Sequence, residues 1–184
     1  MNGPDRQEIV AGLQERAAKA REYRAKLIRS QLSDTEIDTG RHEEHANAEY
    51  LRRIASTYGW PGRSLVGEEA AEAALTIALY ADDNVGLQRT LLRMIHEAAK
   101  RGEATITQWA HLYDRVLIRD QRPQVYGTQY RVTSEGIESA PIADPDNLDQ
   151  RRASVGLPPY AEQAEALLRQ YIHQPPHNPT EEST

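Results

Sequence analysis

Apolar positions recur every three or four residues over most of this chain, which is the spacing of amphipathic helices. Over residues 5–31 the apolar stripe is thin and rich in alanine, and it predicts one long helix. A second helix is predicted over residues 41–58, with Asp38 or Thr39 as its cap, and residues 33–40 are expected to form a linker. Gly59 suits the residue that follows a helix, and the Trp60-Pro61 pair confirms that this helix stops there.

Three further helices are expected in the middle of the chain. Residues 68–81 are apolar on most sides, so they predict the central, buried helix. Asn84 is the expected N-cap of a helix that runs to Lys100. Thr105 or Thr107 opens the next helix, which carries apolar residues as far as Leu117.

The pattern changes after residue 121 from helical spacing to alternation rich in β-formers. Residues 124–132 and 137–142 predict the two strands of a β-hairpin. Two more helices are expected over residues 148–155 and 160–173, and the composition of residues 174–184 is that of a disordered tail.

The chain is therefore predicted to be mainly α, a single helical domain of five to seven helices with one β-hairpin. Residues 1–37 form the long N-terminal helix and linker in this division. Residues 38–173 form the globular domain with the hairpin near residues 124–142, and the tail follows.

Charge and composition exclude several classes of function. The formal net charge is −6, and acidic residues are interleaved with the basic ones, which argues against nucleic-acid binding. No apolar run approaches the ~20 residues that span a bilayer, and the N-terminus does not resemble a signal peptide, so we expect no membrane association. The absence of cysteine removes disulfides and thiolate chemistry and is compatible with a cytoplasmic location.

A histidine-rich segment on the second helix is the candidate metal site. His42, His45 and Glu49 are spaced three and four apart and can share one helix face. The order of residues is HEEH, however, and not the HExxH of zinc proteases. A solvated polar face is the favoured interpretation, so neither a metal nor a cofactor is predicted.

Candidate proton-transfer groups lie at the ends of two predicted helices. Tyr80 and Asp82 lie at the end of the central helix and could form such a pair. Helix capping explains the neighbouring Asp83 and Asn84 and leaves Tyr80 and Asp82 open. His111 and Asp114 are three apart on the fifth helix, where a carboxylate could orient an imidazole. A surface pair within the helix explains them equally well.

The most informative stretch runs from Asp114-Arg115 to the segment QVYGTQ at residues 124–129. Arginine can hold a carboxylate or phosphate through two hydrogen bonds, so Arg115 is a candidate substrate ligand. The segment itself places a phenol, a hydroxyl and amides close together. Its candidate site residues are Gln124, Tyr126, Thr128 and Gln129. A buried network that ties the helix to the hairpin explains the same residues, and the two interpretations are evenly balanced.

These motifs together resemble a bacterial, mainly actinobacterial, domain family of unknown function over residues 48–160. The resemblance is carried by GWP at residues 59–61, DRV at 114–116, YGTQ at 126–129, DQRR at 149–152 and several single residues between them. Family members often have histidine where this chain has Tyr80, so a catalytic role of that histidine would pass here to a tyrosine. The resemblance implies the fold and no activity.

The resulting hypothesis is a small enzyme that acts on a small polar metabolite, such as one of specialised metabolism, by general acid/base chemistry. Tyr80, Asp114 and Tyr126 would be catalytic. The substrate would be held by Asp82, Arg115, Gln124, Thr128 and Gln129. The alternative is a non-catalytic protein that binds a small molecule or another protein, with the long N-terminal helix available to dock a second copy of the chain.

Overall fold

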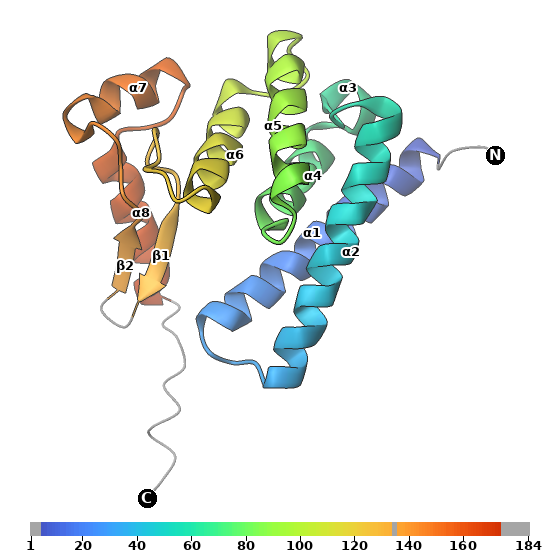
Figure 1. The fold of residues 1–184 in the computed structure, drawn as a ribbon, viewed down its shortest axis with the longest axis horizontal. Helices are drawn as coiled ribbons and strands as arrows, with labels where there is room; N and C mark the ends of the chain where they lie inside the picture. The colour runs from blue at the N-terminus through green and yellow to red at the C-terminus, as the bar shows by residue number, and fades with distance from the viewer. Residues whose placement is uncertain (1–4, 134–135, 174–184) are drawn as a thin grey trace, which may run out of the picture.

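The computed structural model describes residues 5–133 and 136–173, without the side chains of residues 132, 133, 136, 137 and 170–173. This part of the chain forms eight α-helices and one antiparallel hairpin, which confirms the predicted class (Figure 1). The helices are α1 (Arg6–Ile28), α2 (Asp34–Tyr58), α3 (Arg63–Val66), α4 (Glu68–Tyr80), α5 (Val85–Lys100), α6 (Ile106–Arg119), α7 (Leu148–Ser154) and α8 (Tyr160–His173). The strands are β1 (Tyr130–Thr133) and β2 (Gly136–Ser139), and a short 3₁₀ helix, η1 (Pro145–Asn147), precedes α7.

Helix α4 is the centre of the helical bundle, as its all-round apolar sequence predicts. It packs against α1, α2, α3, α5 and α6. The small alanines of α4 let its neighbours approach closely, and the large aliphatic side chains come mostly from those neighbours. The fully buried aliphatic residues of this core are Ile9, Leu13, Leu51, Ile77, Leu91, Ile95 and Leu112.

The narrow apolar face of α1 packs into the core of the same chain. Ile9, Leu13, Ala17 and Ala20 are all buried in the same core as α4. These residues are therefore not available as a docking face, although oligomerisation through other parts of α1 stays a prediction.

Helices α1 and α2 pack closely at two points, and at each point a tyrosine of one helix lies against a glycine of the other. Tyr50 of α2 lies against Gly12 of α1, and Tyr23 of α1 lies against Gly40 of α2. A Cβ atom at either glycine would overlap the facing tyrosine. The Tyr23 hydroxyl also donates a hydrogen bond to the Ile37 carbonyl at 3.2 Å. The two glycines thus act as notches that fix how the helices are aligned.

Two of the predicted boundaries are wrong, and local hydrogen bonding explains the first. Helix α2 begins at Asp34 rather than near residue 41, because Ser33 and Glu36 form a capping box that includes the predicted linker in the helix. The hairpin is shorter than predicted, since residues 124–129 form an irregular turn instead of a strand. Helix α3, a single turn, was not predicted.

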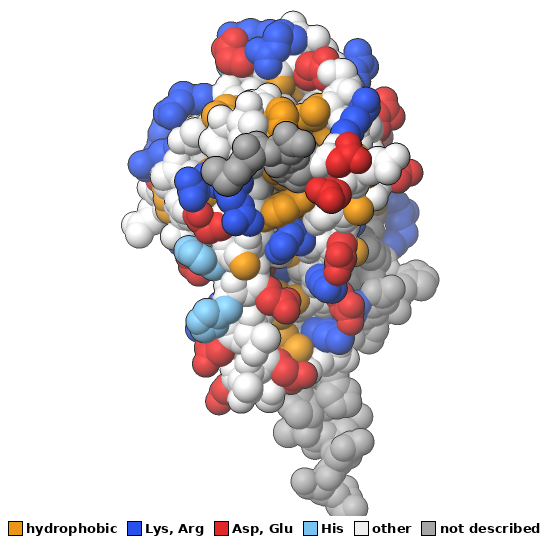
Figure 2. Space-filling model, turned by 90° about the vertical axis from the view of Figure 1, so that its right-hand side faces the viewer, with side chains coloured by type: hydrophobic (Ala, Val, Ile, Leu, Met, Phe, Trp, Pro, Cys, Tyr) orange, Lys and Arg blue, Asp and Glu red, His pale blue; other side chains and the backbone are white. Residues whose placement is uncertain are grey.

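The C-terminal elements lie on one side of α6 and the bundle of α1–α5 lies on the other (Figure 1). The strands pair antiparallel, with Tyr130 opposite Ser139, and β2 packs against α8. Acidic and basic side chains are interspersed over the face that carries α2 and α3 (Figure 2). No helix in the described part of the chain is long and apolar enough to cross a lipid bilayer.

Candidate functional site

The turn of residues 124–129, which we call the clamped turn, is held through its amide groups by one carboxylate. Asp114 of α6 is completely buried and accepts the backbone N–H groups of Val125, Tyr126 and Thr128 at 2.8, 3.1 and 3.0 Å. It also accepts the Thr128 hydroxyl at 3.0 Å. These donors occupy both carboxylate oxygens, so Asp114 here shapes the backbone and is shielded from solvent.

Two arginines of α7 hold the carbonyl groups of the same turn. Arg152 is fully buried, and its Nη1 donates to the Tyr126 carbonyl at 2.6 Å, while its Nε donates to the Pro158 carbonyl at 2.7 Å. The Nε of Arg151 donates to the Val125 carbonyl at 2.9 Å. A buried guanidinium that is hydrogen-bonded to several carbonyls replaces the water that those groups would otherwise bind.

Gln124 joins the clamped turn to the chain that leaves the hairpin after β2. Its side chain is buried; Nε2 donates to the Ala140 carbonyl at 2.8 Å, and Oε1 accepts the Gln129 N–H at 2.8 Å. Gly127 has a φ of +65°, and the Tyr160 ring lies 3.1 Å from the position a Cβ would take there. The glycine therefore serves both the backbone conformation and the close approach of α8.

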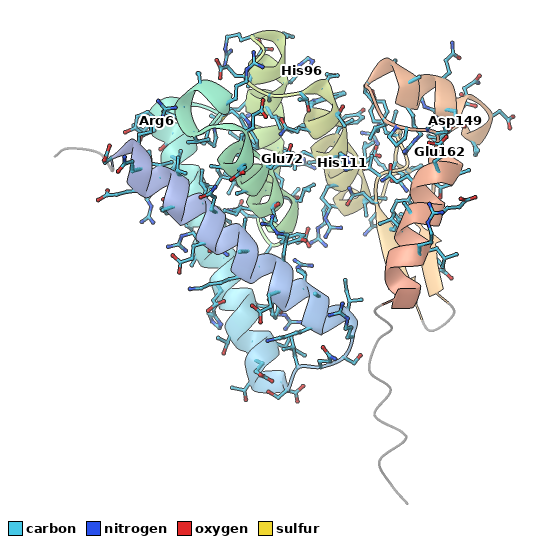
Figure 3. The ribbon with its side chains drawn as sticks, turned by 180° about the vertical axis from the view of Figure 1, so that it is seen from behind. Arg6, Glu72, His96, His111, Asp149 and Glu162 are labelled. Atoms are coloured by element: carbon cyan, nitrogen blue, oxygen red, sulfur yellow. The ribbon has the colours of Figure 1, made fainter. Side chains whose placement is uncertain are left out.

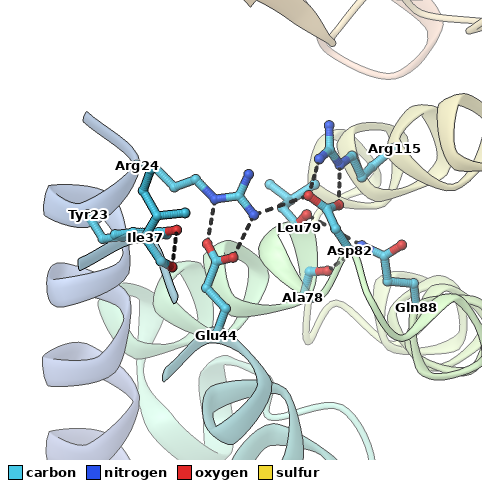
Figure 4. Close-up of polar contacts among 9 residues, drawn as sticks. All are labelled: Tyr23, Arg24, Ile37, Glu44, Ala78, Leu79, Asp82, Gln88 and Arg115. Carbon is cyan, nitrogen blue, oxygen red and sulfur yellow. Dashed lines mark hydrogen bonds and ion pairs between the residues drawn. The ribbon is translucent and has the colours of Figure 1, made fainter. Parts of the chain in front are cut away.

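A second polar cluster is an ion-pair network of Glu44, Arg24, Asp82 and Arg115 (Figure 4). It joins α2, α1, the turn after α4 and α6 in that order. Arg24 donates to Glu44 at 2.9 Å and to Asp82 at 3.1 Å, and the Nε of Arg115 donates to Asp82 at 2.8 Å. A second contact joins Arg115 Nη2 to the other oxygen of Asp82, so this pair is bidentate.

The network shifts the pKa values of its two acids in opposite directions. Burial alone would raise the pKa of Asp82, but Arg115 and Arg24 outweigh it and hold that pKa below its usual value. Burial dominates at Glu44 and raises its pKa despite Arg24. Tyr80 lies beneath the Arg24 guanidinium at 4.9 Å from the ring centre, and burial raises its pKa.

The hollow beside these clusters is a pocket of about 300 Å³ between the end of α6 and the hairpin, which we call the arginine pocket. Its cationic residues are Arg115, Arg122 and Arg131. Its apolar residues are Ile118, Pro123, Tyr130, Ala140 and Pro141, and Gln121 and Gln129 complete the lining. None of these ten described residues is acidic.

The end of α6 explains why Arg122 lies at this pocket. Gln121 adopts a left-handed conformation with a φ of +57°, and its N–H bonds to the Ile118 carbonyl at 3.0 Å. The Arg122 N–H bonds to the Leu117 carbonyl at 2.9 Å. This pair of bonds is a Schellman motif, which ends the helix and turns the chain toward the hairpin.

Tyr126 of the clamped turn packs in a cluster of aromatic rings with two residues of α6. Trp109 and Tyr113 stack with ring centres 4.9 Å apart, and Tyr126 meets both rings edge-on. His96 of α5 lies 5.2 Å from Trp109. Burial raises the pKa of Tyr126, which favours its neutral phenol form.

His111 lies on the side of α6 that is close to Glu72 of α4 (Figure 3). Burial lowers the pKa of its imidazole, while the carboxylates of Asp114 and Glu72 act in the opposite direction. Its carbonyl accepts the Gln129 side-chain amide at 3.3 Å.

The residues predicted as one site are thus distributed over three environments. Asp114, Gln124 and Thr128 are buried in the clamped turn. Tyr80, Asp82 and Arg115 belong to the ion-pair network, and Tyr126 belongs to the aromatic cluster. Among them, only Arg115 and Gln129 line the arginine pocket.

Sequence reasoning missed the residues whose partners are far along the chain. Arg24 looks like one of many charges on α1, and nothing in its neighbourhood signals Glu44 or Asp82. Nothing close in sequence to Arg151 and Arg152 indicates that they hold the clamped turn. The usable signal was the DQRR motif itself, because it accompanies YGTQ in the resemblance.

The candidate metal ligands on α2, His42, His45 and Glu49, do not form a metal-binding cluster in the described structure. Among the side chains that the structure describes, no group of three or more His, Asp or Glu is arranged to hold a metal ion. The His42 ring nitrogen lies 2.8 Å from the Asp38 carbonyl, and Glu49 accepts a hydrogen bond from Arg52 at 2.8 Å.

Comparison with known proteins gives one match. The model of a family of unknown function, DUF6624, matches residues 26–173. No curated protein and no solved structure shows significant similarity to the chain. The matched range includes the clamped turn, the arginine pocket and most of the ion-pair network, and it leaves out most of α1.

Proposed function

The chain therefore belongs to DUF6624, a family of unknown function, and we propose from the chemistry of the arginine pocket that it is a non-catalytic protein that binds a small anionic molecule. The observation that carries this proposal is a pocket with three arginines and no acidic residue in its described lining. Its volume of about 300 Å³ lies at the lower end of the range typical of small-molecule sites.

Titration chemistry favours binding over catalysis at this pocket. Its titratable side chains are arginines and Tyr130, whose pKa burial raises still further above neutrality. General acid/base catalysis works best with a group whose pKa is near the operating pH. Of the three predicted catalytic residues, Asp114 has its oxygens occupied, and Tyr80 and Tyr126 are not in the pocket lining.

The proposal is tested by titrating ¹⁵N-labelled protein with benzoate, octanoate and inorganic phosphate and following amide resonances. We expect at least one of these anions to shift the resonances of Ile118, Arg131 and Ala140, three residues of the lining. Arg122→Gln should weaken that binding about tenfold, because a hydrogen bond to a charged group contributes roughly 1.5–3 kcal/mol.

Arg93→Gln is the matched control, since it removes the same charge from the exposed face of α5, outside the pocket. The proposal is wrong if none of the three anions shifts the lining, or if both variants weaken binding equally. Proton NMR of the same mixtures after long incubation should show the bound anion unchanged. Conversion of the anion would support the enzyme hypothesis instead.

A further inference from the structure

We infer that the ligand of the arginine pocket is an apolar monocarboxylate, a molecule with a single carboxylate on a hydrocarbon or aromatic body. The inference rests on the proposed binding function and specifies the chemistry of the ligand. It follows from three features of the lining: its net charge, the hydrogen bonding of its floor, and the geometry of its cationic groups.

The charges around the pocket leave one cation uncompensated. Arg115 forms a bidentate pair with Asp82, which lies outside the lining. Arg131 faces Glu138 across the hairpin, with 3.7 Å between the charged groups. Arg122 is exposed and has no acidic partner among the described residues. A net charge of about one at the pocket matches a monoanion, whereas a phosphate monoester brings close to two negative charges at neutral pH.

The floor of the pocket suits a ligand body without hydroxyl groups. Pro123 and Pro141 contribute no backbone N–H. The Gln124 N–H is already bonded to the Pro141 carbonyl at 2.8 Å, and the Ala140 N–H is bonded to the Gln129 carbonyl at 3.2 Å. Hydroxyl groups of a sugar-like ligand would lose water there without finding these partners, which is unfavourable. Apolar carbon needs no hydrogen-bond partner there.

The cationic groups suit a flat anion. A guanidinium presents its donors in one plane and pairs with a carboxylate through two parallel hydrogen bonds. Arg122 has both edges of this plane available among the described residues. Arg115 uses Nε and Nη2 for Asp82, and its Nη1 is turned away from that carboxylate (Figure 4). Two arginines can therefore approach one carboxylate, while the hydrocarbon lies against Ile118 and Tyr130.

The test is calorimetry and amide-resonance mapping with four eight-carbon or polar probes at one ionic strength. Octanoate carries both features of the inferred ligand, octanol lacks the charge, gluconate lacks the apolar body, and octyl phosphate carries the larger charge. We expect octanoate to bind at the lining at least tenfold more tightly than octanol or gluconate, and no more weakly than octyl phosphate.

A variant that changes the charge of the pocket gives a test that does not depend on the hydrocarbon part of the probe. Glu138→Gln on the exposed edge of the hairpin removes the partner of Arg131 and raises the pocket charge by one. Its binding of octyl phosphate should tighten more than its binding of octanoate. Glu97→Gln, on the exposed side of α5 and outside the lining, is the matched control and should change neither.

The possible failures are distinguishable. Equal binding of octanoate and octanol, equal binding of octanoate and gluconate, or tenfold tighter binding of octyl phosphate overturns the monocarboxylate inference while the pocket remains a ligand site. If none of the four probes shifts the resonances of the lining, both the inference and the proposed binding function are wrong.

Discussion

Asp114 and Arg152 hold the same residue from opposite sides: the Asp114 carboxylate accepts the Tyr126 N–H, and the Arg152 guanidinium donates to the Tyr126 carbonyl. Both side chains are fully buried, and they do not form a direct salt bridge within the described structure. The negative charge of Asp114 and the positive charge of Arg152 are each stabilised by the polar backbone groups of Tyr126 that lie between them. The residues that make the sequence look like an active site are thereby the ones that shape the backbone beside the arginine pocket.

Asp114→Asn should lower the free energy of unfolding by about 2–4 kcal/mol. The carboxylate now accepts hydrogen bonds at both of its oxygens, whereas asparagine would keep one oxygen and place an NH₂ group, itself a donor, against the other backbone donors. The measurement is urea denaturation followed by circular dichroism. Asp146→Asn in the exposed η1 removes the same charge and should change the unfolding free energy by less than about 0.5 kcal/mol. Equal effects of the two variants would contradict the role of Asp114.

Arg152→Lys should cost at least about 2 kcal/mol, although the charge is conserved. A lysine ammonium cannot reach the carbonyls of Tyr126 and Pro158 and the side chain of Gln163 together, as the guanidinium does. Combined with Asp114→Asn, the loss should be smaller than the sum of the two, because both variants release the same turn. Strict additivity in this double-mutant cycle would show that the two residues act separately.

Gly40→Ala should destabilise the protein even though alanine is the better helix former by about 1 kcal/mol. The added methyl group would overlap the Tyr23 ring, so α1 and α2 must move apart. Gly86→Ala in α5 is the opposite case, because the nearest atom that its Cβ would meet is the Asn84 side-chain oxygen at 3.9 Å. Thermal unfolding should give a lower Tm for the first variant and an unchanged or higher Tm for the second.

The stability of the protein should fall on mild acidification through His111. Its folded pKa lies below the unfolded value of about 6.5, so the unfolded chain takes up a proton first as the pH decreases. The contribution is present above about pH 6.5 and is lost progressively as the pH falls from there through the folded pKa. Urea midpoints between pH 7.5 and 5 should therefore decline less steeply in His111→Gln than in the wild type.

His45→Gln on the exposed face of α2 is the control for this measurement. Its urea midpoints should follow the wild-type pH dependence. If His111→Gln and the wild type decline in parallel, the imidazole of His111 is not the group responsible.

The helices could be predicted well because their signals are local. Thr105 and Gln108 form the capping box that opens α6, and the Asn84 side chain caps α5 at 3.0 Å, both from residues three apart. The same kind of signal, at Ser33 and Glu36, was present for α2 and was interpreted as a linker. That error was therefore avoidable from the sequence.

The clamped turn could not be predicted in the same way. Its alternation of polar and apolar residues is typical of a strand, whose amides would bond to a neighbouring strand. Asp114 supplies acceptors for three of those amides in its place. A glycine at position 127 is compatible with a close approach of another group, but the sequence does not say that Tyr160 is that group.

The sequence by itself determined the helical class, the centrality of α4 and the presence of a hairpin, because periodicity and caps act between residues three or four apart. Only the tertiary structure decided that Asp114 faces amides rather than a ligand, that Arg24 joins Glu44 to Asp82, and that Arg122 meets Arg115 at one pocket. Buried charges take the partners that desolvation makes necessary, and those partners come from whichever segments the packing of the helices brings near.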